Sequence, residues 1–276
     1  MTQRSILITG CSSGIGRHCA LQLHKEGWQV FATARKIEDI EALKNEGVTA
    51  IYMDYTDHQS IKACVEAVLN HTGGQLDALF NNGAYGQAGA VEDLKTDILR
   101  TQFEANLFGW HELTCQIIPV MRRQGYGRII HCSSVLALTG LAFRGAYVAS
   151  KYALEGLTDT MRIEMHGSNI SISMIQPGPI TSQFRENARL NFISTVDTEN
   201  SVYSERYKHR LKAMESDAPG KFELPPEAVY KKLHHALHAR NPKPRYMVTV
   251  PTYIMNVLRR FLPTRALDAF LRAYGD

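Results

Sequence analysis

A regular alternation of short apolar runs with helical patterns, over residues 1–180, constrains this chain's fold more than any other feature. The apolar runs are continuous, which is typical of strands buried on both faces of a parallel sheet. Such strands are joined by right-handed crossovers through helices, which gives a doubly wound sheet. The pattern therefore predicts a Rossmann-like α/β fold. We expect strands at 5–9, 29–34, 49–53, 76–80, 128–132 and 170–175, and helices at 14–26, after Asp57, at 96–124 with a break near Pro119, and at 147–166.

The remaining residues read as an elaboration of the same domain. Hydrophobic residues are 44% and charged residues 21% of the 276 positions, which excludes a disordered or collagen-like chain. A chain of this length can bury a large core without disulfides. We expect one domain over 1–276, with its core at 1–182, an irregular segment at 183–222, and C-terminal helices and a tail at 223–276.

Charge and cysteine content narrow the function classes. The net charge of +4 is too small to require a nucleic-acid partner, and it fits an enzyme that handles a phosphorylated anion. Five scattered cysteines without a C-x-x-C pair are typical of reduced thiols in the cytosol. The apolar N-terminal stretch is too short for a signal peptide, and no run of about 18 apolar residues indicates a membrane span. We therefore expect a cytoplasmic protein.

A glycine-rich turn, TGCSSGIG at 9–16, separates the first expected strand from the first helix. Gly10 permits a backbone conformation that a Cβ would strain, Gly14 lets a ligand approach the backbone, and Gly16 lets the helix pack closely. The helix N-terminus offers free N–H groups and a partial positive charge to phosphates. An ordinary tight turn is the alternative, but the strand before and the helix after favour nucleotide binding. The candidate cofactor-binding residues of this turn are Gly10, Ser12, Ser13, Gly14, Ile15 and Gly16.

The end of the second strand bears on which nucleotide binds. An acidic residue there would bind the adenosine ribose 2′-hydroxyl, but the chain has Arg35 and Lys36. The arginine fork suits a phosphate, so we predict NADP(H) rather than NAD(H). A solvated charge pair is the alternative, and Glu38 and Asp39 close by weaken the phosphate interpretation.

The stretch AYVASK at 146–151 indicates proton chemistry. Tyr147 and Lys151 are four residues apart, so on a helix they share one face. An ammonium near a phenol lowers a pKa that is normally about 10, which allows proton exchange near neutral pH. Ser134 follows the fifth strand thirteen residues earlier, at the sheet edge where ligands bind. Any amphipathic helix can contain this tyrosine–lysine pair, and serines such as Ser133 and Ser134 also serve turns.

Taken together, these residues resemble the short-chain dehydrogenase/reductase family in its compact single-domain form. The resemblance covers about residues 4–182. Its motifs are TGCSSGIG at 9–16, Asn81-Asn82, Asn106, Ser134, Tyr147, Lys151 and Pro177-Gly178. One departure is Gly83-Ala84, where the family commonly has Ala-Gly; the exchange moves a methyl group near Tyr85 and removes no catalytic group.

The resemblance implies a mechanism. Hydride passes between a nicotinamide and a carbonyl carbon, with Tyr147 as general acid for reduction and base for oxidation. Ser134 would hold the carbonyl oxygen, Lys151 would bind the nicotinamide ribose and tune the tyrosine, and Asn106 would support a proton-relaying water. Ser13 and Arg35 match positions used by NADP-preferring members. The other implied cofactor contacts are Asp54 and Tyr55 at the adenine, Asn82 at the adenosine ribose, and Ile180 and Ser182 at the carboxamide.

The resemblance also indicates the substrate side. The segment 183–222 corresponds to a helical lid over the substrate, and its aromatic and aliphatic residues predict an apolar aldehyde, ketone or alcohol. The motifs TGCSSGIG and YVASKYALEG are similar to those of the hydroxysteroid and retinol dehydrogenase-like branch of the family. That branch includes bacterial NADP-dependent aldehyde reductases. Family analogy predicts a homodimer through the helices at 96–124 and 147–166.

The C-terminal region leaves two interpretations open. The tail at 251–276 combines apolar residues with four arginines and could lie on an anionic membrane surface, although a cleft cap or dimer contact is preferred. Pro263 should divide it into two short helices. His234, His235 and His238 have no acidic or cysteine neighbour in sequence, so we expect solvated helix residues and no metal.

Two rivals come from other functional classes. One is a protein that binds NADP(H) without chemistry. The other is a peripheral membrane protein whose tail is its main functional element. An epimerase or dehydratase is disfavoured, because such relatives usually place the glycines differently and carry a larger C-terminal domain.

Overall fold

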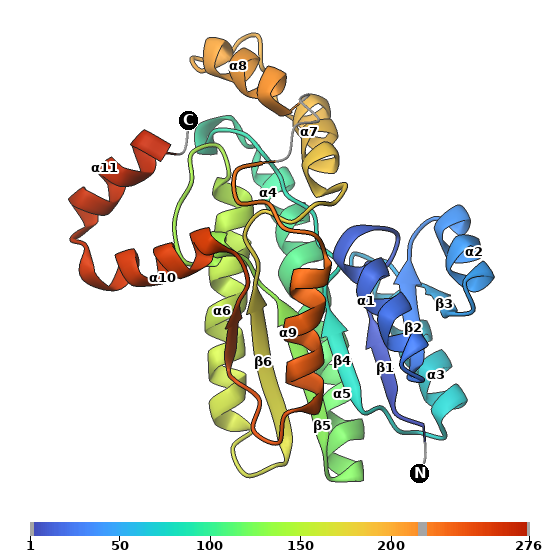
Figure 1. The fold of residues 1–276 in the computed structure, drawn as a ribbon. Coiled ribbons are helices and arrows are strands. Elements are labelled where there is room, and N and C mark those ends of the chain that lie inside the picture. The colour runs from blue at the N-terminus through green and yellow to red at the C-terminus, as the bar shows by residue number, and fades with distance from the viewer. Residues whose placement is uncertain (1–2, 215–219, 275–276) are drawn as a thin grey trace.

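A seven-stranded parallel sheet forms the centre of the protein, seen in a computed structural model that describes residues 3–214 and 220–274. The strand order is β3-β2-β1-β4-β5-β6-β7, and every neighbouring pair is parallel (Figure 1). This confirms the predicted doubly wound α/β fold. The strands are β1 (Ser5–Ile8), β2 (Gln29–Ala34), β3 (Thr49–Tyr52), β4 (Ala78–Asn81), β5 (Gly127–Cys132), β6 (Ile170–Gln176) and β7 (Arg245–Met247).

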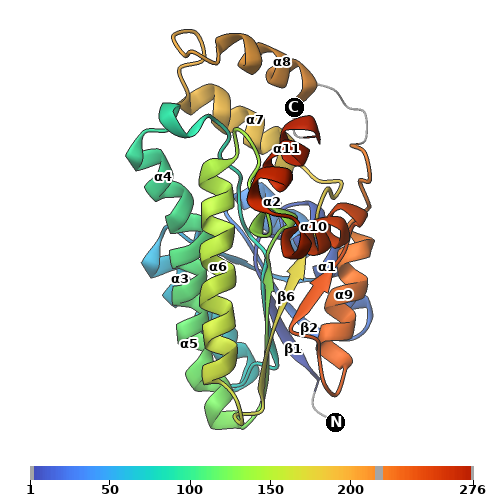
Figure 2. The same ribbon diagram turned by 90° about the vertical axis from the view of Figure 1, so that its left-hand side faces the viewer.

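Helices cover both faces of this sheet (Figure 2). On one face lie α1 (Gly14–Lys25) and α9 (Glu227–His238). On the other lie α3 (His58–Thr72), α4 (Thr96–Phe103), α5 (Gly109–Gln124) and α6 (Gly145–Glu164). The short helix α2 (Ile37–Asn45) joins β2 to β3. Because both faces are covered, all three central side chains of β1, Ile6, Leu7 and Ile8, are fully buried. That double burial is the reason the strand sequences are continuously apolar.

Two local expectations have different outcomes. Asp57 caps α3 as predicted, since its carboxylate accepts from the N–H groups of Gln59 and Ser60. The predicted break near Pro119 is wrong. Pro119 lies inside α5, on the exposed side, where water can reach the carbonyl that its missing N–H leaves unpaired. The interruption is instead a π-helical turn at Glu104–Phe108 between α4 and α5.

The sheet continues beyond the expected core boundary at residue 182. After β6 come α7 (Phe184–Thr195) and α8 (Ser204–Met214), which form the irregular segment above the strand ends. The chain then returns through α9 to β7, which pairs with β6. Sequence analysis missed this strand because it has only three residues and no apolar run. The tail forms α10 (Val250–Phe261) and α11 (Thr264–Tyr274), divided at Pro263 as predicted.

Candidate active site

The candidate site lies at the carboxyl end of the sheet, where the strand order reverses between β1 and β4. Open α/β sheets bind ligands at such a reversal. The turn after β1 begins with Gly10 at a φ of +69° and ends at Ser13, whose extended backbone starts α1 without a side-chain cap. Within the described residues, neither the Ser12 nor the Ser13 hydroxyl forms a hydrogen bond, so both are available to a ligand.

The glycines of this turn are required by close backbone contacts. A Cβ on Gly10 would overlap the backbone of Gly83, and one on Gly16 would overlap the carbonyl of Gly10. A Cβ on Gly14 would lie 2.7 Å from Cβ of Ser182. Two roles differ from expectation: Gly14 also makes room for the 177–182 loop, and Gly16 lets α1 pack on its own preceding turn rather than only on the sheet.

The side chains of Asn82 and Tyr55 form hydrogen bonds with the residues at the start of this turn. The Asn82 side-chain amide donates to the carbonyls of Thr9 (3.0 Å) and Gly10 (3.3 Å). Tyr55 is buried, and its hydroxyl lies 2.7 Å from both Thr9 Oγ1 and Asn81 Oδ1. Because the Tyr55 ring points into the protein, the adenine contact predicted for it would come from its main chain. The ribose contact predicted for Asn82 stays a prediction.

A charged pair lies at the carboxyl ends of β2 and β3, where Arg35 follows β2 and Asp54 follows β3. Arg35 is 69% exposed, and its Nη1 is 3.5 Å from Oδ2 of Asp54. The other Asp54 oxygen accepts from the backbone and hydroxyl of Thr56. Asp54 is therefore turned toward Arg35, and the guanidinium keeps most of its surface free for a phosphate.

Ser134 and Tyr147 come together as predicted. Ser134 follows β5, and its Oγ accepts from the N–H of Leu136 at 3.1 Å. Tyr147 begins the buried face of α6. Burial raises the pKa of its phenol well above 10, and the nearby Ser134 hydroxyl opposes that rise. The expected lowering of this pKa by Lys151 is not found in the cofactor-free site, because burial outweighs the favourable contacts.

Lys151 lies beneath the tyrosine in a closed environment. It is 1% exposed, and its Nζ donates to the carbonyl of Cys132 at 2.9 Å. The amine is 5.7 Å from the Tyr147 ring centroid and 4.2 Å from that of Trp110. Burial lowers the pKa of this amine to about 8, against the opposing influence of Cys132 and Glu155. The buried environment therefore disfavours the charged form of the Lys151 amine.

The π-helical turn between α4 and α5 positions Asn106. Its side chain is fully buried, donates to the carbonyl of Tyr85 at 2.9 Å and accepts from the Tyr85 N–H at 3.2 Å. The same amide lies 3.3 Å from Ser150 Oγ, next to Lys151 on α6. Widened turns of this kind often occur at functional sites, because they redirect one side chain out of the regular helix.

Phe184, the first residue of α7, packs against the Tyr147 phenol. Its ring makes an edge-on contact with Tyr147, with centroids 5.4 Å apart. A Cβ on Gly86 would lie 2.8 Å from Phe184 Cζ. Among the predicted carboxamide contacts, Ile180 lies in the segment just before α7 and bridges to Leu224. The Ser182 hydroxyl donates to the Ile180 carbonyl at 3.2 Å. These residues lie together in the segment that leads from β6 into α7.

Three contributing residues were missed from sequence. Trp110 lies under Lys151, and its indole N–H donates to the Gly83 carbonyl at 2.8 Å. Cys132 supplies the carbonyl that holds the lysine. The buried Glu155 carboxylate accepts from Ser133 Oγ at 2.6 Å. That bond gives Ser133 a structural role and distinguishes it from Ser134. Glu155 follows Lys151 by four residues on α6, so helical spacing could have indicated it. Trp110 and Cys132 come from α5 and β5, and no spacing in the sequence relates them to the lysine.

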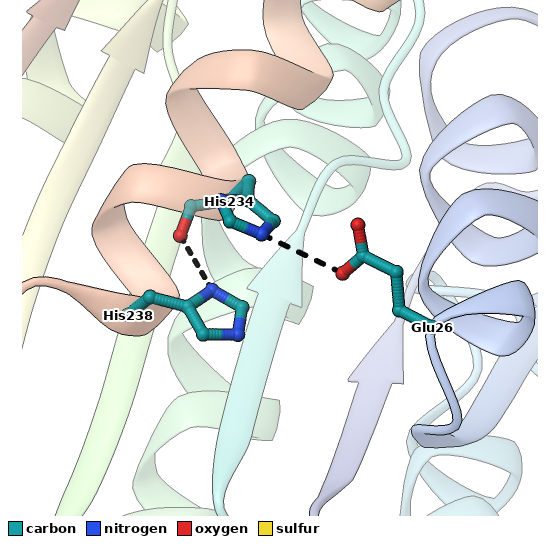
Figure 3. A group of neighbouring side chains, drawn as sticks. All are labelled: Glu26, His234 and His238. Atoms are coloured by element: carbon teal, nitrogen blue, oxygen red, sulfur yellow. Dashed lines mark hydrogen bonds and ion pairs between the residues drawn. The ribbon is translucent and has the colours of Figure 1, made fainter.

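The histidines of α9 have an acidic neighbour that the sequence did not indicate. Figure 3 shows Glu26 from the end of α1 beside His234 and His238, with Nε2 of His234 3.6 Å from Oε2 of Glu26. His238 Nε2 is 2.8 Å from the guanidinium of Arg4, and the Tyr230 hydroxyl donates to Glu26. These contacts join α1 to α9. Glu26 and His238 stay exposed and His234 is half-buried, so the histidines are solvated, as expected, and also bonded to another helix.

Known proteins share this fold and arrangement. The family model described as short chain dehydrogenase matches residues 4–191. The chain is 39% identical to the uncharacterized oxidoreductase YbbO of Escherichia coli, over 98% of this chain and 94% of that protein. It is 37% identical to human retinol dehydrogenase 8, over 66% of this chain and 60% of that protein.

Two solved structures with bound nucleotides have similar folds. A variant of actinorhodin polyketide ketoreductase with NADPH gives a TM-score of 0.71 at 26% identity, over 89% of this chain and 95% of that chain. A short chain dehydrogenase/reductase from Burkholderia phymatum in complex with NAD gives 0.78 at 20% identity, over 98% and 95%.

Proposed function

The chain belongs to the short-chain dehydrogenase/reductase family, and from that premise we propose that it is an NADP(H)-dependent reductase of lipophilic aldehydes or ketones. The observation that carries the proposal is the position of the Lys151 amine, 5.7 Å from the ring centroid of the buried Tyr147, together with a Ser134 hydroxyl near enough to oppose the rise in the pKa of that phenol. This group lies at the same sheet edge as the glycine turn. A phenol and an alcohol can therefore hold one carbonyl oxygen beside a bound nucleotide.

A nicotinamide dinucleotide fits the cleft residues. The hydroxyls of Ser12 and Ser13 are free within the described chain, and the first N–H groups of α1 have no side-chain cap. They suit a pyrophosphate. The exposed Arg35 guanidinium suits a 2′-phosphate and supports NADP(H) over NAD(H). When bound, the cofactor supplies hydride to the carbonyl carbon, or accepts it from the alcohol.

The protein's own residues handle the oxygen and the proton. In reduction Tyr147 donates its proton to the carbonyl oxygen, while Ser134 hydrogen-bonds the same atom. Burial keeps the phenol protonated in the free enzyme, which is the state that a general acid needs. Lys151 would bind the nicotinamide ribose and stabilise the phenolate left after proton transfer. Asn106 would support a water that returns a proton through Lys151.

The substrate class follows from the lid. The Phe184 ring lies directly on Tyr147, and Phe192 and Tyr207 pack into an apolar cluster behind it. An apolar wall favours a lipophilic carbonyl compound. Oxidation of a hydroxysteroid- or retinol-type alcohol is the second candidate, favoured by the identity with human retinol dehydrogenase 8.

We also propose a homodimer through α4, α5 and α6. These helices expose Leu99, Phe108 and Ile163, which an intersubunit contact would bury. Light scattering of the protein eluted from a size-exclusion column measures its molar mass and tests this oligomeric state directly. A cytoplasmic location stays a prediction; Cys11, Cys19, Cys64 and Cys132 are buried as free thiols, and Cys115 is exposed.

The deciding experiment measures NADPH consumption with a panel of aldehydes, ketosteroids and retinoids, and repeats it with NADH. Tyr147→Phe should lower kcat at least about 10²-fold, because it removes the general acid, while NADPH affinity stays unchanged. Turnover kept by Tyr147→Phe would contradict the assigned role. Inactivity on the whole panel, with NADPH still bound, would favour the non-catalytic nucleotide-binding alternative.

A further inference from the structure

Helix α10 exposes an apolar stripe to solvent. Helices packed on a globular core normally turn such a stripe inward. The residues recur at helical spacing, so they share one face, and Phe261 at its end is 79% exposed. The α10 stripe consists of Val250, Tyr253, Ile254, Val257 and Phe261.

Contacts on the opposite side fix this orientation. Thr252 and Met255 are buried against the body of the protein. The Arg259 guanidinium lies over the Tyr152 ring at 5.2 Å and donates to the carbonyl of Ala137 at 3.5 Å. The inner face of α10 is therefore already used, and the stripe stays directed away from the body.

Positive charge accompanies the stripe. Helices α10 and α11 contain four arginines and one aspartate, a net charge of +3 in a chain whose total is +4. Arg260 is exposed beside the stripe, and Arg265 is exposed at the start of α11. Figure 1 shows both helices extending from the body. An apolar face flanked by arginines suits the boundary between lipid headgroups and acyl chains.

The surface adjoins the candidate active site. Leu267 and Leu271 of α11 line a cavity of about 510 Å³ together with Leu138 and Leu141. The loop that carries Leu138 and Leu141 connects Ser134 to the start of α6, and so to Tyr147. A lipid surface held by α10 and α11 would lie next to this loop.

We propose that α10 and α11 dock the protein peripherally on an anionic lipid bilayer, with the α10 stripe inserted below the headgroups and Arg260 and Arg265 at phosphate level. No helix within the described ranges is long and apolar enough to cross a membrane. A second copy of the chain fits the surface less well, because a two-fold interface would bring its uncompensated arginines together. The docking does not depend on the proposed reaction.

The test is flotation of the full-length protein with vesicles of phosphatidylglycerol and phosphatidylcholine, compared with pure phosphatidylcholine. We expect binding to the anionic vesicles that weakens in high salt. The double variant Val257→Glu/Phe261→Glu should lower partitioning at least about tenfold, because it removes the buried apolar area. Leucine at the same two positions should retain binding.

Charge reversal tests the electrostatic part. Arg260→Glu with Arg265→Glu should lower partitioning to anionic vesicles by about fivefold or more for each arginine. Arg123→Glu, an exposed change at the end of α5, is the matched control and should bind like the wild type. Circular dichroism and NADPH binding identify any variant that fails to fold.

Several outcomes would overturn the proposal. One is equal binding to both vesicle types, and another is wild-type binding by the Val257→Glu/Phe261→Glu variant. A protein that stays off vesicles, but changes from dimer to monomer in that variant, would identify the stripe as a self-interface. None of these readouts uses turnover, so failure of the docking proposal and failure of the proposed function are distinguishable.

Discussion

The buried amine of Lys151 should destabilise the cofactor-free protein less as the pH rises. Its Nζ is enclosed by Trp110, Tyr147 and the Cys132 carbonyl, and no carboxylate in the described part of the chain forms an ion pair with it. Burial lowers the pKa of the amine from 10.5 to about 8. The charged form is therefore disfavoured in the folded state.

The sign and size follow from linkage. Between about pH 8 and 10.5 the unfolded chain binds the lysine proton and the folded chain has lost it, so the contribution of Lys151 to stability rises with pH. One pKa unit corresponds to about 1.4 kcal/mol, which gives about 3 kcal/mol in total. Most of this should be present by pH 10. The Cys132 thiol, whose pKa burial raises to about 11, is still mainly protonated there.

The assay is urea unfolding of the wild type and of Lys151→Met across this pH range. The difference in unfolding free energy between the two proteins isolates the lysine, because other groups titrate in both. Lys62→Met, an exposed change on α3, controls for the loss of a surface charge. If the unfolding free energies of the wild type and of Lys151→Met changed in parallel with pH, the lowered pKa assigned to the buried lysine would be wrong.

Three further perturbations test other parts of the site. Arg35→Asp should raise the KM for NADPH at least about tenfold more than the KM for NADH, because a carboxylate repels the 2′-phosphate; equal losses would contradict NADP(H) preference. Tyr55→Phe should lower the unfolding free energy by about 1–2 kcal/mol, since it removes a buried hydroxyl from two partners, and an unchanged urea midpoint would contradict this. Phe184→Ala should raise kcat/KM for bulky ketones relative to short aldehydes by uncovering Tyr147; an unchanged ratio would remove Phe184 from the lid.

Predictions from sequence succeeded where the signal was local. The central strands are buried on both faces, so each reads as an apolar run, and Asp57 caps α3 from within one turn. The strand β7 and the π-helical turn at Glu104–Phe108 were missed. Neither has a distinctive local pattern: the first is fixed by pairing with β6, and the second by the bonds of Asn106 to Tyr85.

The pKa values of Tyr147 and Lys151 could not be predicted from their spacing in the sequence. Four residues of separation predicted that Lys151 would lower the pKa of Tyr147. In the folded protein both groups are buried, and desolvation moves the two pKa values toward the neutral forms. Desolvation depends on what surrounds a group from every side, and Trp110 and Phe184 arrive there from distant segments.

The sequence by itself determined the order of the first six strands and the helices between them, and it indicated the glycine turn and the tyrosine–lysine pair of the candidate site, because these depend on neighbours within a turn or a strand. Only the tertiary structure decided that Tyr55 points inward, that Phe184 covers the phenol, and that the apolar side of α10 faces solvent. Periodicity shows that a helix has an apolar side. Which way that side faces depends on what the rest of the chain packs against it.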